Sequence, residues 1–159
     1  MLLIGLTHTR ISLSLRDDTD NRKLSVLESV QSTSMIQAFA TLLADTEAGR
    51  LAGHMAEVSY EQPGVAVSGI IGRRGIHSKD VQFVLANNRE VSRCRLHSIV
   101  KMLMSSSRVC EEGLQPVFVL RLTLPPADCD VTLQQKKVVV SFRDLDLVVC
   151  VLEKGVKSK

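Results

Sequence analysis

The sequence predicts an α+β (or α/β) fold, in which right-handed βαβ crossovers place helices against a sheet. The order of the predicted segments supports this fold class, and the length and composition indicate one globular core. Strand-like and helix-like segments follow one another in the order strands, helix, strands, helix, strands, helix. The chain has 159 residues, which suits a single core. Hydrophobic residues make up 45% and charged residues 23%, as in ordinary globular proteins. We therefore expect helices to cover at least one face of the sheet.

The first predicted elements are a hairpin and a helix. Polar and apolar residues alternate over positions 11–15, which predicts a half-buried strand. The polar run 16–23 is rich in turn formers and predicts the loop of a hairpin. Ser34 then precedes an apolar stripe at helical spacing, with Gln37 three residues later, which is the pattern of a capping box. The stripe consists of Met35, Ile36, Phe39, Leu42 and Leu43.

The middle of the chain predicts three strands and a helix. Strands are expected at 54–60 and 65–71, joined by a Gln-Pro-Gly turn, and at 81–86, where Asn87-Asn88 forms the next turn. The helix follows, because Leu96, Ile99, Val100 and Leu103 recur at helical spacing.

The carboxyl-terminal part predicts two strands and a last helix. The strands are expected at 117–124, ending at Pro125-Pro126, and at 138–142. The helix is expected at about 145–154, with Asp144 as its N-cap.

Basic residues are concentrated between positions 73 and 108, although the whole chain carries a net charge of only +3. Eight basic residues oppose Asp80 and Glu90 there, which leaves +6 in this stretch and about −3 elsewhere. Such a stretch predicts an anionic partner, with a solvated surface as the alternative. Aromatic residues make up only 3%, which argues against nucleic-acid modules that stack bases on aromatic side chains. The eight are Arg73, Arg74, Lys79, Arg89, Arg93, Arg95, Lys101 and Arg108.

Catalytic and metal-binding motifs are not recognisable in the sequence. The four histidines are scattered, and His97 is expected on the solvated flank of its helix. The four cysteines form no Cys-x-x-Cys pair, and Asp128 with Asp130 is better explained by a turn before a strand than by a metal site. We expect no catalytic residue and no metal site in this chain. No apolar run reaches the roughly 18 residues that span a bilayer, so we expect no membrane partner.

Two segments resemble motifs of the MutL family of DNA mismatch repair proteins. Residues 82–91 (QFVLANNREV) resemble its motif Q-y-x-F-V-N-x-R-x-V, with Asn87, Arg89 and Val91 matching. Residues 128–142 (DCDVTLQQKKVVVSF) resemble its motif D-V-N-V-H-P-x-K-x-E-V-x-F, in which the lysine matches Lys137. Residues 68–71 (SGII) fit the strand before the first motif. Positions 82–103 and 142–157 look closest to the eukaryotic homologue that acts in meiotic crossing-over.

The resemblance covers residues 10–157 and implies the transducer domain of this family, with residues 1–9 as a lead-in from a preceding linker. It implies a ribosomal S5 domain 2-like sheet with helices packed on one face. It also implies that Lys137 reaches the γ-phosphate of ATP, which is held with Mg²⁺ by an ATPase domain that this sequence does not include. Closure around ATP would then drive dimerisation and DNA binding. A loop lysine suits this role, because its flexible ammonium acts as a point charge.

The implied partners are DNA, bound without regard to sequence, and a second MutL homologue as heterodimer partner, in the nucleus. We expect Lys137 and Arg89 to lie at different strand ends, so that one faces nucleotide and the other DNA. The residues expected to contact DNA are Arg73, Arg74, Asn87, Arg89, Arg93, Arg95 and Lys101.

The sequence departs from the family pattern before the lysine. Thr132, Gln134 and Gln135 replace the family's Asn, His and Pro, and Lys136 could serve instead of Lys137 if the register shifts by one. No ATP hydrolysis is expected from this chain alone. The alternative function is a nucleic-acid-binding or protein-interaction module of the same fold without a role for ATP.

Overall fold

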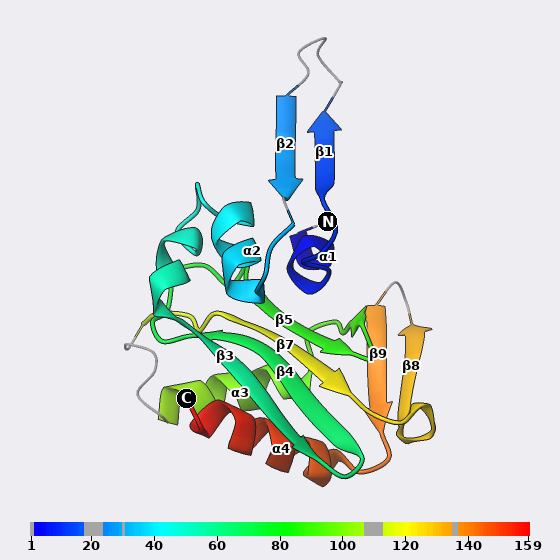
Figure 1. Ribbon diagram of the computed structural model, residues 1–159. Helices are drawn as coiled ribbons and strands as arrows, with labels where there is room; N and C mark the ends of the chain where they lie inside the picture. The colour runs from blue at the N-terminus through cyan, green and yellow to red at the C-terminus, as the bar shows by residue number, and fades with distance from the viewer. Residues whose placement is uncertain (1, 18–23, 30, 107–112, 135–136) are drawn as a thin grey trace. The chain divides into compact units, whose positions relative to one another are not determined.

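The computed structural model describes residues 2–17, 24–29, 31–106, 113–134 and 137–159 (Figure 1). The chain forms two compact units, Met1–His54 and Met55–Lys159. The predicted division into a lead-in at 1–9 and a transducer domain at 10–157 stays a prediction. Several predicted features lie outside the described residues: most of the hairpin loop (18–23), Arg108, Cys110, Gln135 and Lys136.

The first unit contains the predicted hairpin and helix. Strands β1 (Leu13–Asp17) and β2 (Leu24–Ser29) pair in antiparallel fashion. Helix α2 (Met35–Leu42) follows, and a 3-10 helix spans Gly49–His54. Helix α1 (Leu2–Thr7) precedes them, within the segment where the sequence predicts only a lead-in.

The capping pattern of α2 is confirmed, with one bond displaced. The Ser34 hydroxyl accepts a hydrogen bond from the Gln37 backbone N–H at 3.2 Å. In return, the Gln37 side-chain oxygen accepts from the N–H of Thr33, at 3.0 Å, rather than from that of Ser34. Both bonds satisfy backbone donors at the start of the helix, which therefore begins where the sequence predicts.

The second unit is built on a five-stranded sheet in the order β3-β4-β7-β5-β6. All neighbours are antiparallel except β5 and β7, which are parallel and connected through helix α3 (Arg95–Ser106). A separate hairpin, β8 (Cys129–Gln134) with β9 (Lys137–Phe142), leads into helix α4 (Leu145–Lys157). The predicted strands are confirmed to within a few residues. The sheet strands are β3 (Met55–Gln62), β4 (Val65–Gly72), β5 (Gln82–Ala86), β6 (Arg89–Glu90) and β7 (Phe118–Thr123).

Helices α3 and α4 pack together on one face of this sheet, as Figure 1 shows. The register aligns Val67, Leu122 and Ala86 across β4, β7 and β5, and these side chains join the buried core. Val100 of α3 and Val151 of α4 belong to the same core. The predicted α+β fold, a sheet with helices on one side, is confirmed.

Gly69 lies where β4 approaches β7 too closely for any other residue. Its φ is +145°, and a Cβ atom at this position would lie 2.0 Å from the carbonyl oxygen of Val119. Real Cβ atoms do not come within 3.0 Å of such an oxygen. The glycine in the SGII segment is therefore required by the spacing of the two strands.

Helix α4 is longer than predicted. We expected it to end near Lys154, but it continues through Gly155 to Lys157. A Cβ on Gly155 would lie 2.8 Å from a methyl group of Val67 and 3.1 Å from one of Val58. The glycine therefore lets the helix approach β3 and β4 closely, and here it does not terminate the helix.

Candidate nucleic-acid interface

The turn after β5 is held in one conformation by its two asparagines. Asn87 and Asn88 have positive φ angles of 48° and 66°, as in a type I′ turn. The side-chain oxygen of Asn87 also accepts a hydrogen bond from the N–H of Leu124, at 2.9 Å. Arg89 follows directly and is exposed. The turn is thereby fixed to the end of β7, and it presents Arg89 to solvent.

Two hydrogen bonds join Ser92, the residue that follows the first MutL-like motif, to Val138 within the second motif. The N–H of Ser92 donates to the carbonyl of Val138 at 2.9 Å, and the N–H of Val138 donates to the Ser92 hydroxyl at 2.9 Å. Lys137 precedes Val138, starts β9 and is exposed. Arg89 and Lys137 start different strands, and each lies close in sequence to this connection.

Three cations of the basic stretch lie together. The Arg93 guanidinium donates to the carbonyl oxygen of Lys79 at 2.7 Å. Partial burial, and then the charges of Lys79 and Arg93, lower the pKa of Lys101 below its ordinary value. Among the described residues no carboxylate forms an ion pair with any of the three. This cation cluster of Lys79, Arg93 and Lys101 could hold an anionic group such as a phosphate.

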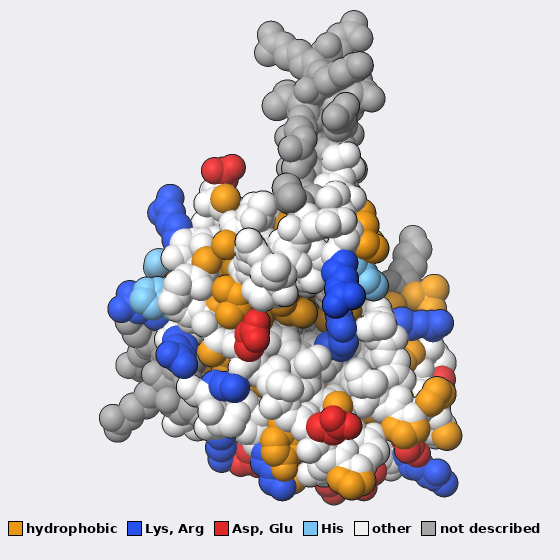
Figure 2. Space-filling model, viewed as in Figure 1, with side chains coloured by type: hydrophobic (Ala, Val, Ile, Leu, Met, Phe, Trp, Pro, Cys, Tyr) orange, Lys and Arg blue, Asp and Glu red, His pale blue; other side chains and the backbone are white. Residues whose placement is uncertain are grey.

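The remaining predicted DNA contacts are spread more widely. Arg73 and Arg74 follow the end of β4, where Gly72 bonds to Val117. Arg89 follows the far end of β5, where the N–H of Asn87 bonds to Leu122. These bonds are five residues apart on one strand, or about 17 Å. Figure 2 likewise shows Lys and Arg side chains at several separate places on the face it presents.

Lys79 belongs to the basic stretch that predicts an anionic partner, but it is not among the residues singled out as DNA contacts. It lies 14 residues before Arg93, and no periodicity connects the two. Only the folded chain brings their segments together, so the cation cluster could not be found from spacing.

His97 is buried, which corrects the prediction that it is solvated. Only 5% of its surface is exposed, and its ring packs against Phe118 with 6.1 Å between ring centroids. Its Nδ1 accepts a hydrogen bond from the N–H of Cys94 at 3.3 Å, the position that Gln or Glu occupies in a capping box. Burial lowers the pKa of His97, and the charges of Arg93 and Lys101 lower it further.

The stability of the chain should therefore depend on pH through His97. Its folded pKa is lowered, so the unfolded chain binds this proton more readily. The stabilisation is fully present above the unfolded pKa of about 6.5 and is lost as the pH falls below it through the folded pKa. We expect His97→Gln, which keeps an acceptor for the Cys94 N–H, to flatten this dependence in denaturant melts between pH 7.5 and 5. An unchanged slope in the variant would show that other groups cause it.

The two residues of the acidic pair lie in different elements, because Asp130 belongs to β8 and pairs with Ser141 of β9. Asp128 ends a 3-10 helix (Pro126–Asp128), and its carboxylate lies 3.5 Å from the Arg143 guanidinium. No group of three or more His, Cys, Asp or Glu residues in the described ranges could hold a metal ion. The helices of these ranges also include none that is long and apolar enough to cross a membrane.

Residues 45–159 match the family model described as "DNA mismatch repair protein, C-terminal domain". The chain belongs to this family. It is 22% identical to the human DNA mismatch repair protein Mlh3 over 174 aligned residues, which cover 97% of this chain and 12% of the relative. It is 24% identical to the DNA mismatch repair protein MutL of Petrotoga mobilis over 104 residues, which cover 64% of this chain and 16% of that protein. The MutL resemblance is thus confirmed, over a small part of each relative.

Solved structures of related domains share the fold. The N-terminal domain of a DNA repair protein superposes with a TM-score of 0.72 at 18% identity, covering 99% of this chain and 50% of the other. The Aquifex aeolicus MutL ATPase domain complexed with ADP superposes with a TM-score of 0.55 at 15% identity, covering 96% and 44%. This mismatch-repair chain therefore spans about half of each of these two domains, and the likeness supports the S5 domain 2-like fold.

Proposed function

We propose that this chain is the transducer of a MutL-type mismatch repair protein, which couples ATP binding in a preceding ATPase domain to dimerisation and DNA binding. One observation carries the proposal: the hydrogen bonds between Ser92 and Val138 join the segment of Lys137 to the segment of Arg89. If Lys137 bound a phosphate and β9 moved, these bonds would therefore also displace the segment that contains Arg89. The same proposal includes a second MutL homologue as heterodimer partner, action in meiotic recombination and a nuclear location.

The residues of this chain fit ATP only in part. Lys137 is exposed at the start of a strand and can offer its ammonium to a terminal phosphate. The described residues contain no ligand cluster for Mg²⁺, so the ion and most of the nucleotide would be held by the ATPase domain. When bound, the nucleotide would supply the negative charge that Lys137 detects.

DNA binding is the second part of the proposal, and the cation cluster supports it. The backbone bonds next to Arg73-Arg74 and next to the Arg89 turn are separated by about 17 Å along β7, a span over which duplex DNA carries about ten phosphates. One duplex could therefore contact both groups without base-specific contacts. The cation cluster needs no nucleotide, and it is the observation that favours the alternative, a DNA-binding module without a role for ATP.

Arg89→Glu should lower the affinity of the chain for DNA and make that affinity less dependent on salt concentration. Each phosphate neutralised contributes about −0.9 to the slope of log K against log salt on duplex DNA. Reversing this charge should make the slope shallower by about one or two units. The measurement is a fluorescence anisotropy titration of a short duplex without nucleotide, at several salt concentrations.

Arg50→Glu is the matched control, because it makes the same charge change at an exposed position outside the basic stretch. Its slope should equal that of the natural chain. Wild-type affinity that hardly changes between low and moderate salt would contradict the proposed phosphate contacts. Equal losses in both variants would show an effect of net charge alone.

A further inference from the structure

Lys101 is a helical lysine that lies beside two other cations. It stands one turn after His97 on the same face of α3, and Arg93 stands four residues before His97, just ahead of the helix. Lys79 belongs to the loop between β4 and β5. The bond from the Arg93 guanidinium to the carbonyl oxygen of Lys79, at 2.7 Å, holds this loop at the start of α3. The cation cluster therefore joins two segments of the chain, and Lys101 is its member within the helix.

The surroundings of Lys101 disfavour its ammonium form. Partial burial, and then the positive charges of Lys79 and Arg93, lower the pKa of this lysine. His97 is buried and has a lowered pKa of its own, so its ring adds no charge near pH 7. Among the described residues, no carboxylate forms an ion pair with Lys101. A larger share of Lys101 than of a lysine in water is therefore the neutral amine, which is the nucleophilic form.

We propose that Lys101 is a modification site, at which its amine takes the acyl group of phosphate-bearing acyl thioesters such as acetyl-coenzyme A. The positive side chains of Lys79 and Arg93 hold the phosphates beside the amine. The nitrogen attacks the thioester carbonyl carbon, so that an N–C bond forms and the C–S bond breaks. The sulfur leaves with the proton that the nitrogen gives up. The products are an acylated lysine and a free thiol, and no oxidant or further reagent is needed.

Acylation would remove one charge from the cation cluster. The amide product is neutral, whereas the ammonium of Lys101 can contact a phosphate of the DNA backbone. This consequence rests on the proposed function, in which Lys101 is one of the DNA contacts. Loss of one phosphate contact should lower the affinity for duplex DNA and make the slope of log K against log salt shallower by about 0.9. DNA bound at the cluster should in turn shield Lys101 from the thioester.

Lys154 offers an internal comparison on the neighbouring helix α4. Its ammonium lies 5.7 Å from the centre of the Tyr60 ring. A hydrogen bond with Tyr60, followed by the interaction with Cys150, raises the pKa of this lysine. Lys154 is also more exposed than Lys101. Faster reaction at Lys101 would therefore reflect the cation cluster and not easier access.

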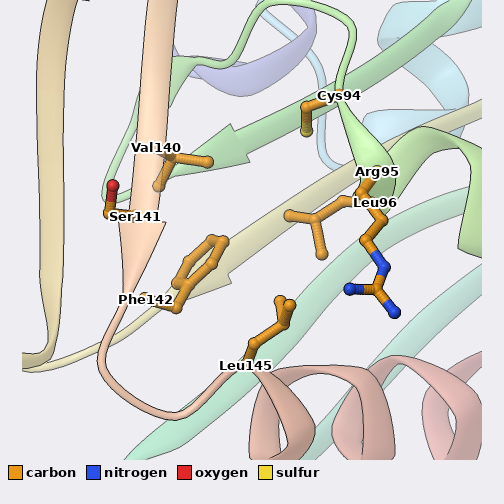
Figure 3. A pocket seen from close by; sticks show the side chains of 7 residues that line it. All are labelled: Cys94, Arg95, Leu96, Val140, Ser141, Phe142 and Leu145. Atoms are coloured by element: carbon orange, nitrogen blue, oxygen red, sulfur yellow. The ribbon is translucent and has the colours of Figure 1, made fainter.

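Arg95 is the matched control for the cluster, because it carries the same charge on another side of α3. It lines a cavity of about 250 Å³ between α3, β9 and α4, where Figure 3 shows it with Phe142. It stands two positions before His97, and side chains at this spacing do not face each other on a helix. The charges that lower the pKa of Lys101 are those of Lys79 and Arg93, and not that of Arg95. Lys79→Gln and Arg95→Gln thus remove equal charges, but only the first from beside Lys101.

The test incubates the full chain with acetyl-coenzyme A without DNA, and peptide mass mapping gives the rate of acetylation at each lysine. We expect Lys101 to react about threefold or more faster than Lys154. Lys79→Gln should slow Lys101 by about twofold or more, whereas Arg95→Gln should leave its rate nearly unchanged. The neutral thioester S-acetyl-N-acetylcysteamine has no phosphate, so Lys79→Gln should slow it less. Circular dichroism melts confirm that each variant is folded.

The proposal is overturned if Lys154 reacts as fast as Lys101, or if Lys79→Gln and Arg95→Gln have the same effect. It is also overturned if Lys79→Gln slows both thioesters equally, because the cluster would then not hold the phosphates. A short DNA duplex added to the reaction should slow acetylation at Lys101 but not at Lys154. Fast acetylation at Lys101 without this protection would refute the DNA contact at the cation cluster, while the acylation site would stand.

Discussion

Gly69→Ala is expected to destabilise the Met55–Lys159 unit by about 4 kcal/mol or more, which should leave the chain largely unfolded at 37 °C. The new Cβ would lie 2.0 Å from the carbonyl oxygen of Val119, and this oxygen belongs to a backbone that cannot rotate away. The φ of +145° adds strain, because side-chain-bearing residues rarely adopt it. Relief would require β4 to move from β7, and β4 also pairs with β3. Thermal melts followed by circular dichroism measure the effect.

Gly53→Ala provides the control for this substitution. A Cβ at Gly53 would meet no atom within 4 Å, so the melting temperature should change little. If Gly69→Ala melted at the temperature of the natural chain, the close approach of β4 and β7 would be refuted. If Gly69→Ala lowered the melting temperature only moderately and the circular dichroism spectrum still showed the sheet, β4 and β7 would have separated only near position 69.

Lys137→Ala is expected to reduce ATP-dependent dimerisation roughly tenfold or more, when the chain is fused to the ATPase domain of a close homologue. A charged hydrogen bond to the terminal phosphate would be lost, while the charges of the basic stretch would remain. DNA affinity without nucleotide should therefore be almost unchanged. Size-exclusion chromatography with and without a non-hydrolysable ATP analogue measures dimerisation, and anisotropy measures DNA affinity.

Two further variants sharpen this test. Lys137→Arg keeps the charge and should retain part of the response to ATP. Lys136→Ala should have little effect, because the family motif matches Lys137 and not Lys136. A loss with Lys136→Ala but not with Lys137→Ala would assign phosphate sensing to the neighbouring residue. If Lys137→Ala and Arg89→Glu gave the same defects, their roles would not be separate.

Local signals predicted most of the fold. The Asn87-Asn88 pair predicted a turn because asparagine tolerates positive φ, and Asp144 predicted the start of α4 because its carboxylate accepts the N–H of Leu147. The end of α4 was predicted about three residues too early, and Gly155 lies inside the helix. Its actual role depends on Val67 and Val58, which lie far away in the sequence.

The candidate site could be predicted only in part. The family motifs singled out Lys137 and Arg89, but the link between them depends on the tertiary bonds of Ser92 with Val138, for which the sequence carries no signal. His97 was expected in solvent because it lies beside polar residues on its helix. Its position three residues after Cys94, at the start of the helix, was the available signal, since a side chain there can accept the N–H of the capping residue.

The two asparagines of the β5–β6 turn should differ in how freely they can be replaced during evolution. Both have positive φ, so glycine satisfies the backbone at either position. Only the Asn87 side chain also accepts the N–H of Leu124, and glycine would leave that donor without this partner. Related sequences should therefore drift freely between asparagine and glycine at position 88 while they retain asparagine at position 87. One adjacent pair of identical residues would then contain a permissive site and a constrained one.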